Sequence, residues 1–204
     1  MDYKNLCKAA SDSRQKLIPL TLAILMIVAV SINVSHADLT EMTKLANMDA
    51  QYADFFGSAV SVRGNYAIVG APSDDEMFRN NTGSASVFQL SGSTWALMGD
   101  KLVAVDGQPN DTFGSAVSIS GDYAIVGVPF ASYPETLKFY GAAYIYRRVG
   151  DVWVRDVRLT ASDKEVNDYF ATSVWIAGDY AIVGAPFDDD NGQDSGSAYI
   201  FERS

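Results

Sequence analysis

The chain has 204 residues, of which 48% are hydrophobic and 20% charged, so it has enough apolar material for a folded core and too much for a disordered chain. Its formal net charge of −10 repels nucleic acid and anionic lipid. The only cysteine, Cys7, and the only histidine, His36, lie near the N-terminus, so the rest of the chain can form no disulfide, no Cys/His zinc site and no Ser-His-Asp triad.

The first 37 residues are expected to be a secretory signal peptide. A basic flank ending at Lys16 precedes the apolar run LIPLTLAILMIVAV, and small residues follow at Ser35 and Ala37. We expect cleavage after Ala37, which makes the mature chain secreted, periplasmic or cell-surface, with no membrane span. An uncleaved anchor helix is the alternative, which Pro19 makes less favourable.

A seven-residue segment then recurs along the chain. It reads YAIVGAP at 66–72, YAIVGVP at 123–129 and YAIVGAP again at 180–186, so each step is 57 residues. A phenylalanine recurs with the same step ahead of each copy. The chain therefore contains an internal repeat and is an array of similar units.

Each repeat is expected to form four antiparallel strands. In the second repeat, residues 113–120 alternate apolar and small residues, a Gly-Asp turn follows, and 123–129 continue as a strand that Pro129 ends. A third strand begins at Gly141, and a fourth covers 152–161, rich in β-branched and aromatic residues. No sustained helical period is present, so the fold class is all-β.

Four-stranded units of about 57 residues are typical of β-propeller blades. Blade 1 is predicted at about 54–105, blade 2 at about 111–162 and blade 3 at about 168–204, within a repeat region of 38–204. Residues 38–49 align with the ends of the repeats, because Leu45, Leu102 and Leu159 are 57 apart, and are predicted to be a spare outer strand. Three blades are fewer than the usual minimum of about four. The ring is therefore expected to be incomplete or to be completed by a second copy.

The segments FGSAVSVRGNYAIVGAP and FGSAVSISGDYAIVGVP resemble the FG-GAP repeat of integrin α-chain propellers and of many bacterial surface and secreted proteins. The resemblance covers Asp54 to Phe201. The third copy departs from it with Ala171 after its phenylalanine, and the second has Val128 where the motif has alanine. The resemblance implies a propeller fold and, by analogy alone, a role in binding or adhesion.

The motif residues are expected to be structural. Their glycines let another backbone approach closely, their prolines end strand pairing, and their phenylalanines pack between blades. They are Phe56, Gly57, Gly70, Ala71, Pro72, Phe113, Gly114, Gly127, Pro129, Phe170, Gly184, Ala185 and Pro186. An aspartate stands two residues before each phenylalanine and is expected to cap a loop; these are Asp54, Asp111 and Asp168.

Binding residues are expected on the loops between second and third strands, which differ while the strands repeat. The third loop, FDDDNGQDS, offers hard oxygens on a tight turn, which predicts a Ca²⁺ site formed by Asp188, Asp190 and Asp194. A solvated acidic turn is the alternative. The calcium loop of FG-GAP repeats precedes the Gly-Ala-Pro strand, where this chain has only RGN, SGD and AGD, so no integrin-type metal site is expected.

Three functions fit these features. The first is a non-catalytic secreted or cell-surface binding or adhesion module with a protein or glycan ligand. The second is an enzyme, which we do not expect, because nothing fixes a distance between neighbouring carboxylates such as Asp74 and Asp75. The third is a fragment or accessory part of a larger envelope protein or of a propeller hydrolase.

A homodimer is a further expectation, in which each N-terminal strand completes the last blade of the other copy. Trp175 replaces the Ser61 and Ser118 of the other repeats, and it either meets a partner or fills its own blade.

Overall fold

A computed structural model describes residues 39–47, 49, 51–75, 80–133 and 138–203. The predicted signal peptide and its cleavage site lie outside these residues. The chain divides into two compact units, Met1–Glu41 and Met42–Ser204. Only residues 39–41 of the first unit are described, and they lie in no helix or strand.

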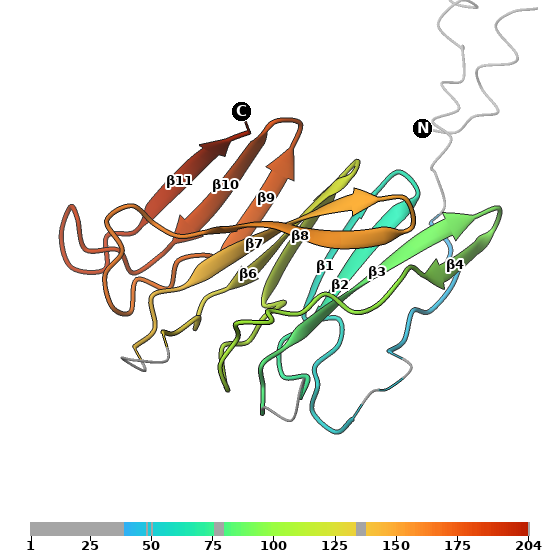
Figure 1. The fold of residues 1–204 in the computed structure, drawn as a ribbon, viewed down its shortest axis with the longest axis horizontal. Helices are drawn as coiled ribbons and strands as arrows, with labels where there is room; N and C mark the ends of the chain where they lie inside the picture. Colours follow the sequence, from blue (N-terminus) through green and yellow to red (C-terminus); the bar gives the residue numbers. More distant parts are fainter. Residues whose placement is uncertain (1–38, 48, 50, 76–79, 134–137, 204) are drawn as a thin grey trace, which may run out of the picture. The chain divides into compact units, whose positions relative to one another are not determined.

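The described residues form eleven strands in three antiparallel sheets and contain no helix (Figure 1). No segment among them is therefore a helix able to cross a membrane. Blade 1 contains β1 (Ala59–Arg63), β2 (Tyr66–Ala71), β3 (Ser84–Ser91) and β4 (Thr94–Leu97). Blade 2 contains β5 (Ala116–Ser120), β6 (Tyr123–Val128), β7 (Ala142–Val149) and β8 (Val152–Leu159). Blade 3 contains β9 (Ser173–Ala177), β10 (Tyr180–Ala185) and β11 (Ser197–Glu202).

Each blade follows the predicted order, with neighbouring strands paired in sequence. The first hairpin of every blade has a two-residue turn that opens with a glycine of positive φ, namely Gly64, Gly121 and Gly178. Such a glycine is what a tight hairpin turn matched to strand twist requires. The all-β prediction and the four-stranded blades are confirmed for blades 1 and 2, and blade 3 has three strands among the described residues.

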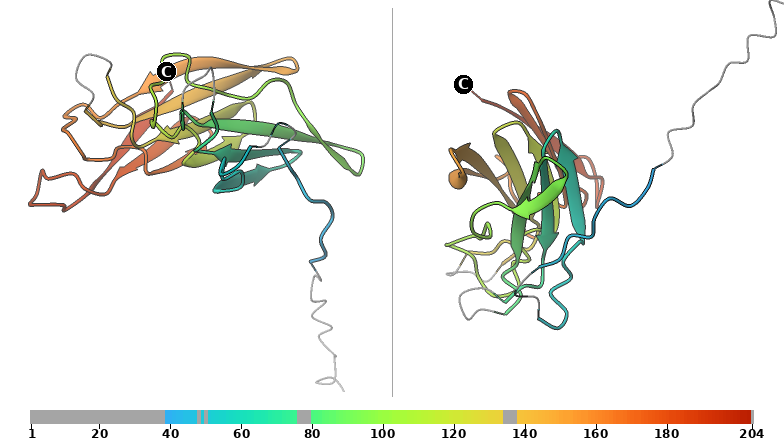
Figure 2. Two further views of the ribbon diagram at one scale, coloured as in Figure 1. Left: turned by 90° about the horizontal axis from the view of Figure 1, so that it is seen from below. Right: turned by 90° about the vertical axis from the view of Figure 1, so that its right-hand side faces the viewer.

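The three sheets stack in chain order, with β1 beside β5 and β5 beside β9 (Figure 2). Apolar residues of the first, second and third strands fill the space between them. Ile68, Val87 and Val117 belong to the cluster between blades 1 and 2, while Ile125 and Ile176 belong to the cluster between blades 2 and 3. The core of the unit therefore lies between the blades.

The repeated motif makes the contact between neighbouring blades. Within each blade the amide after the motif phenylalanine donates to the carbonyl of the Gly-Ala-Pro glycine, at 2.9 Å for Gly57 to Gly70, 3.2 Å for Gly114 to Gly127 and 2.9 Å for Ala171 to Gly184. A Cβ atom on Gly70 would lie 2.0 Å from the carbonyl oxygen of Gly114, and one on Gly127 would lie 2.3 Å from that of Ala171. The motif glycines are thus the points where one blade's backbone reaches the next.

Two of the three motif phenylalanines pack between blades, as the sequence predicts. Phe113 and Phe170 are fully buried between blades, and each packs on two aromatic rings of its own third strand. Phe56 is partly exposed and packs on Phe88. Phe56 differs because no blade precedes blade 1 among the described residues.

The aligned leucines at or after the fourth strand of blades 1 and 2 contact two blades at once. Leu102 pairs with Ala85 of blade 1, and it belongs to the apolar cluster that contains Val126 of blade 2. Leu159 pairs with Ala143 of blade 2 and packs on the cluster that contains Val183 of blade 3.

The N-terminal segment 42–47 packs on the blade that follows it but pairs with no strand among the described residues. Leu45 packs on the cluster that contains Val69 and Phe88 of blade 1, in the place that matches Leu102 and Leu159. However, the described part of 38–49 forms no strand, so it is not an outer strand in this structure. The physical reason is that no third strand among residues 39–203 that the structure describes lies beside it to complete its hydrogen bonds.

Candidate functional site

The loops between second and third strands leave all three blades at the same end of the strands (Figure 1). Each loop is closed by one equivalent backbone hydrogen bond from a glycine amide. These bonds join Gly83 to the Asp74 carbonyl at 2.9 Å, Gly141 to Ala131 at 3.2 Å and Gly196 to Asp188 at 2.9 Å. The three loops therefore have equivalent backbone closures and differ in the residues that each one exposes.

The aspartates before the motif phenylalanines cap the preceding turns. A backbone amide three residues earlier donates to the carboxylate of each, at 2.6 Å for Asp54 and 2.7 Å for Asp111 and Asp168. All three are buried. Burial raises the pKa of Asp111 and of Asp168, although these hydrogen bonds oppose it. Their role in the described structure is to fix loops, as the sequence predicts.

The acidic third loop brings together a different set of aspartates from the predicted one. Carboxylate oxygens of Asp163, Asp188 and Asp190 all lie within 4.8 Å of one another, and Asp194 is not among them. The Asp194 amide instead donates to Asp189 at 2.6 Å, within a turn where Asp194 has a φ of 53°. The structure thus groups Asp163, and not Asp194, with Asp188 and Asp190. The Ca²⁺ site expected from Asp188, Asp190 and Asp194 stays a prediction.

The cluster concentrates negative charge around one buried carboxylate. Asp188 accepts hydrogen bonds from the Tyr199 hydroxyl at 2.6 Å and the Ser197 hydroxyl at 3.0 Å, which hold its pKa below the usual value. The charges of Asp188 and Asp163 raise the pKa of Asp190. Six carboxylic acids line this acidic pocket: Asp163, Glu165, Asp168, Asp188, Asp189 and Asp190. The pocket favours a cationic group.

Blade 1 contains an equivalent pair of aspartates, and a lysine side chain lies between them. Asp49 and Asp74 stand two repeats earlier than Asp163 and Asp188, respectively, in the motif register. Lys101 lies between the two carboxylates. The Lys101 Nζ atom is 2.8 Å from Asp49 and 2.7 Å from the buried carboxylate of Asp74. The hydrogen bond from Lys101 lowers the pKa of Asp49. A lysine from the linking segment thus neutralises two aspartates.

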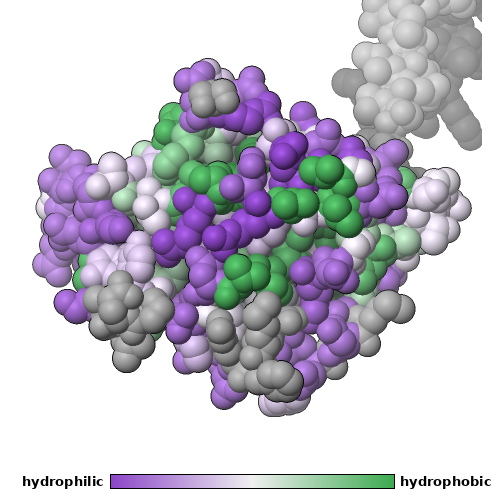
Figure 3. Space-filling view, viewed as in Figure 1, coloured by the Kyte–Doolittle hydropathy of each residue, from purple (hydrophilic) through white to green (hydrophobic). Residues whose placement is uncertain are grey.

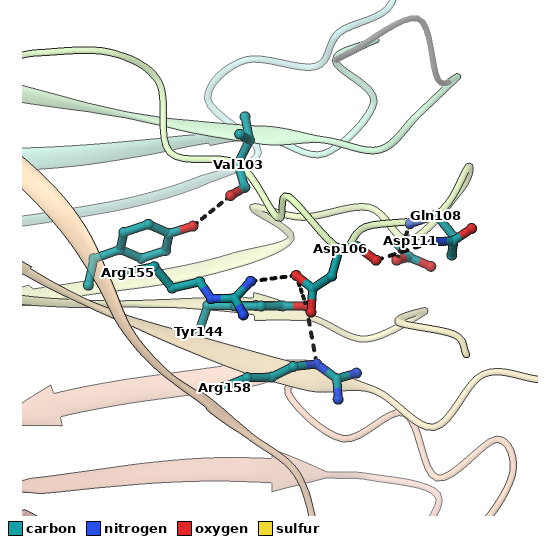
Figure 4. A network of polar contacts seen from close by, with 8 residues as sticks. Val103, Asp106, Gln108, Asp111, Tyr144, Arg155 and Arg158 are labelled. Carbon is teal, nitrogen blue, oxygen red and sulfur yellow. Dashed lines mark hydrogen bonds and ion pairs between the residues drawn. The ribbon is translucent and has the colours of Figure 1, made fainter. Parts of the chain in front are cut away.

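Blade 2 balances its aspartate with arginines from β8 (Figure 4). Arg155 contacts Asp106 at 2.6 Å, and the Tyr144 hydroxyl bridges Asp106 to Arg158 with distances of 3.3 and 3.1 Å. Arg158 occupies the position of Lys101 in the repeat, directly before the aligned leucine. Burial of Tyr144 raises its pKa to about 12. In both blades the fourth strand or its continuation therefore supplies the cation.

A ladder of aromatic rings connects the loops of blades 2 and 3. The Phe130 ring lies 5.7 Å from Phe139 and 5.1 Å from Tyr169, and Tyr169 lies 5.3 Å from Phe187, all edge to face. Phe130 and Phe187 are exposed. Phe187 directly precedes Asp188, so the aromatic ladder ends at the acidic pocket. The combination offers apolar ring faces next to hydrogen-bond acceptors.

The sequence interpretation missed this ladder and the part played by Asp163. The rings come from three separate segments, and only contact in the folded unit shows that they form one surface. Asp163 carried a usable signal, because Asp49, Asp106 and Asp163 are 57 residues apart. Hydrophobic patches also interrupt the hydrophilic surface on the face drawn in Figure 3. Exposed apolar surface is therefore not confined to the ladder.

The adjacent carboxylates Asp74 and Asp75 make contacts within the loop. Asp74 accepts the Ser84 hydroxyl at 2.5 Å in addition to its ion pair with Lys101. Asp75 accepts the amide of Asn81 at 2.8 Å. Both carboxylates therefore hold loop structure.

The comparison with protein families gives three consecutive matches. The sequence model described as FG-GAP repeat matches residues 39–88, 98–146 and 153–201. The first two matches begin in the segments before blades 1 and 2, and the third begins in β8 of blade 2. Each match ends in the third strand of the following blade, in agreement with the packing of Leu45, Leu102 and Leu159. No curated protein matches the chain.

Proposed function

Since this chain belongs to the FG-GAP repeat family and forms propeller-type blades, we propose that it is a non-catalytic binding or adhesion module that acts outside the cell or at its surface. Export is supported by the signal-peptide pattern of the first 37 residues. The role in binding is supported by the exposed aromatic rings on the loops of blades 2 and 3.

The observation that carries the proposal is the aromatic ladder. Exposed aromatic rings on loops of a rigid scaffold supply contact area at low conformational cost, and such rings are enriched where proteins bind ligands. Each ring of the ladder packs edge to face against at least one other ring, and these contacts restrict the orientation of the rings. A ligand therefore meets a preformed surface and binding needs little ordering of the loops.

The neighbouring acidic pocket narrows the chemistry of the ligand. Its carboxylates accept hydrogen bonds or attract cations, while the rings favour apolar faces. Two ligand classes offer both features: a glycan with hydroxyl donors and apolar ring faces, and a peptide segment with aromatic and basic side chains. The net charge of −10 opposes binding to nucleic acid.

The proposal can be tested with glycan and peptide arrays on the chain from residue 38 onward. Ligands that bind the wild type are then titrated against Phe130→Ala and Phe187→Ala. We expect Kd to rise about tenfold or more, because truncating a central aromatic residue typically removes over about 1.4 kcal/mol.

Tyr180→Ala is the matched control, since Tyr180 is an exposed aromatic residue at the hairpin end of β10, away from the loops. An equal loss in Tyr180→Ala, or no change in the two phenylalanine variants, contradicts the assignment of the ladder. Failure of every ligand to bind contradicts the proposed function itself.

A further inference from the structure

We infer that two copies of this chain join head to tail, and that residues 42–47 of one copy form the fourth strand of blade 3 of the other, with Lys44 between Asp163 and Asp188. This inference concerns assembly and goes beyond the proposed function. It rests on the repeat register, on unpaired charge and on exposed apolar faces.

The register defines which residues would meet. Ala143 faces Leu159 and Ile145 faces Val157 in the pairing of β7 with β8. Moving this pairing to blade 3 places Ala198 opposite Leu45 and Ile200 opposite Thr43. Within the described residues, β11 pairs only with β10, and segment 42–47 pairs with no strand. Each of the two elements thus lacks the neighbour that the other supplies.

The charges match in the same register. Lys44 stands directly before Leu45, as Lys101 stands before Leu102 and Arg158 before Leu159. In blade 1, Lys101 lies between the two aspartates that correspond to Asp163 and Asp188. In blade 3 the described residues place no lysine or arginine beside Asp188, and the Tyr199 hydroxyl alone bridges it to Asp163. Lys44 of the second copy completes this site.

The outer faces of blades 1 and 3 are exposed, whereas the equivalent faces of blade 2 are buried against its neighbours. Val62 of blade 1 is 67% exposed, whereas Ile119 at the same position of blade 2 is 3% exposed. On the opposite face, Ile200 of blade 3 is 71% exposed, whereas Ile145 in blade 2 is 6% exposed. Exposed apolar faces and an unpaired strand edge favour association. Because the two faces differ, each contact joins the blade 1 face of one copy to the blade 3 face of the other. Two such heterologous contacts close the pair into a ring.

At the junction between copies, Trp175 stands where the contacts between blades of one copy have a serine. Inside the unit, the Ser61 hydroxyl accepts a hydrogen bond from the Ile119 amide at 3.3 Å, and Ser118 accepts one from Ile176 at 3.2 Å. Trp175 replaces these serines and is 57% exposed, so it does not fill space within its own blade. In the pair its ring lies against the exposed valines of β1 in the second copy. Two three-bladed units then form a six-bladed ring, within the usual propeller range of about four to eight blades.

The experiment is sedimentation velocity and light scattering on residues 38–204, in chelator and at several concentrations. We expect a dimer. Val62→Lys and Ile200→Lys each place a charge on one of the two faces and should raise the dimer Kd about 30-fold or more. Lys44→Glu should weaken the dimer as well, while Arg147→Glu, which reverses an exposed charge on blade 2, should leave it unchanged.

Mixing Val62→Lys with Ile200→Lys tests the head-to-tail arrangement. One junction of the mixed pair contains only unaltered faces, so the mixture should associate more tightly than either variant alone. A monomeric wild type, a dimer that needs Ca²⁺, a dimer unaffected by either face variant, or a mixture no tighter than its components would each overturn the inference. Circular dichroism of the variants confirms that each one is folded.

Discussion

The Gly-Ala-Pro glycine offers a direct test of how the blades pack. We consider Gly70→Ala, Gly127→Ala and Gly184→Ala, which are one substitution at one motif position in three blades. For Gly70 the new methyl group would lie 2.0 Å from the carbonyl oxygen of Gly114 in the next blade, and for Gly127 it would lie 2.3 Å from that of Ala171. For Gly184 the nearest atom is the Ser173 hydroxyl at 2.5 Å, the end of a side chain that can rotate away.

The size of the effect follows from which atoms must move. A backbone carbonyl in a packed interface cannot yield without separating the two sheets, and overpacking of this kind costs roughly 1–3 kcal/mol. We place Gly70→Ala and Gly127→Ala in the upper part of that range, at about 2–3 kcal/mol, which lowers the Tm of a domain of this size by about 4–12 °C. Gly184→Ala should cost less than about 1 kcal/mol.

Urea denaturation and thermal melts measure the three variants in an Ile200→Lys background, so that association of copies does not enter. The reasoning predicts two strongly destabilised proteins and one close to its parent. If Gly184→Ala costs as much as Gly70→Ala, the glycine is needed within its own blade and the account of blade contact is refuted.

Three further predictions concern the loops. Asp111→Ala leaves the amides of Gln108 and Ser132 without their acceptor and should cost about 2 kcal/mol in urea denaturation, whereas Asp111→Asn should cost less. Because the folded-state pKa of Asp190 is raised, its charge opposes folding above that pKa, so Asp190→Asn should raise Tm at pH 7 and lose this advantage as the pH falls below the ordinary aspartate range. In the Ile200→Lys monomer, millimolar Ca²⁺ should raise Tm if the acidic cluster binds it, and Asp190→Ala should abolish that rise; an unchanged wild-type melt would contradict the calcium prediction.

The repeat could be read from the sequence because blade packing constrains the same positions in every copy. A 57-residue step predicts the hairpins and the motif glycines, which the structure confirms, and it aligns the three leucines that pack at equivalent places. Residues 42–47 show the limit of that argument. They keep the position of a linking strand, yet they form no strand, since hydrogen bonding depends on a neighbour that the repeat pattern does not supply.

The loops were less predictable because no period governs them. Closeness in the sequence favoured Asp194 as a third metal ligand beside Asp188 and Asp190. In the structure the Asp194 amide instead donates to Asp189. Asp163, from the end of the preceding repeat, joins the cluster. The aromatic ladder combines Phe130, Tyr169 and Phe187 from two blades. Contacts between separate loops follow from how the blades stack, which the residues of one loop do not specify.

Disulfide trapping can establish whether the register of the repeats continues from one copy into the next. Thr43→Cys and Ile200→Cys combined in residues 38–204 give a protein with no other cysteine, and both positions are exposed in the single chain. Directly opposed residues of antiparallel strands have Cα atoms about 4.5–5.5 Å apart, within the range for a disulfide. The account predicts that mild oxidation links the double variant into a covalent dimer with two disulfides by intact mass, while each single variant stays largely unlinked. A double variant that remains monomeric, or single variants that crosslink equally well, would contradict it.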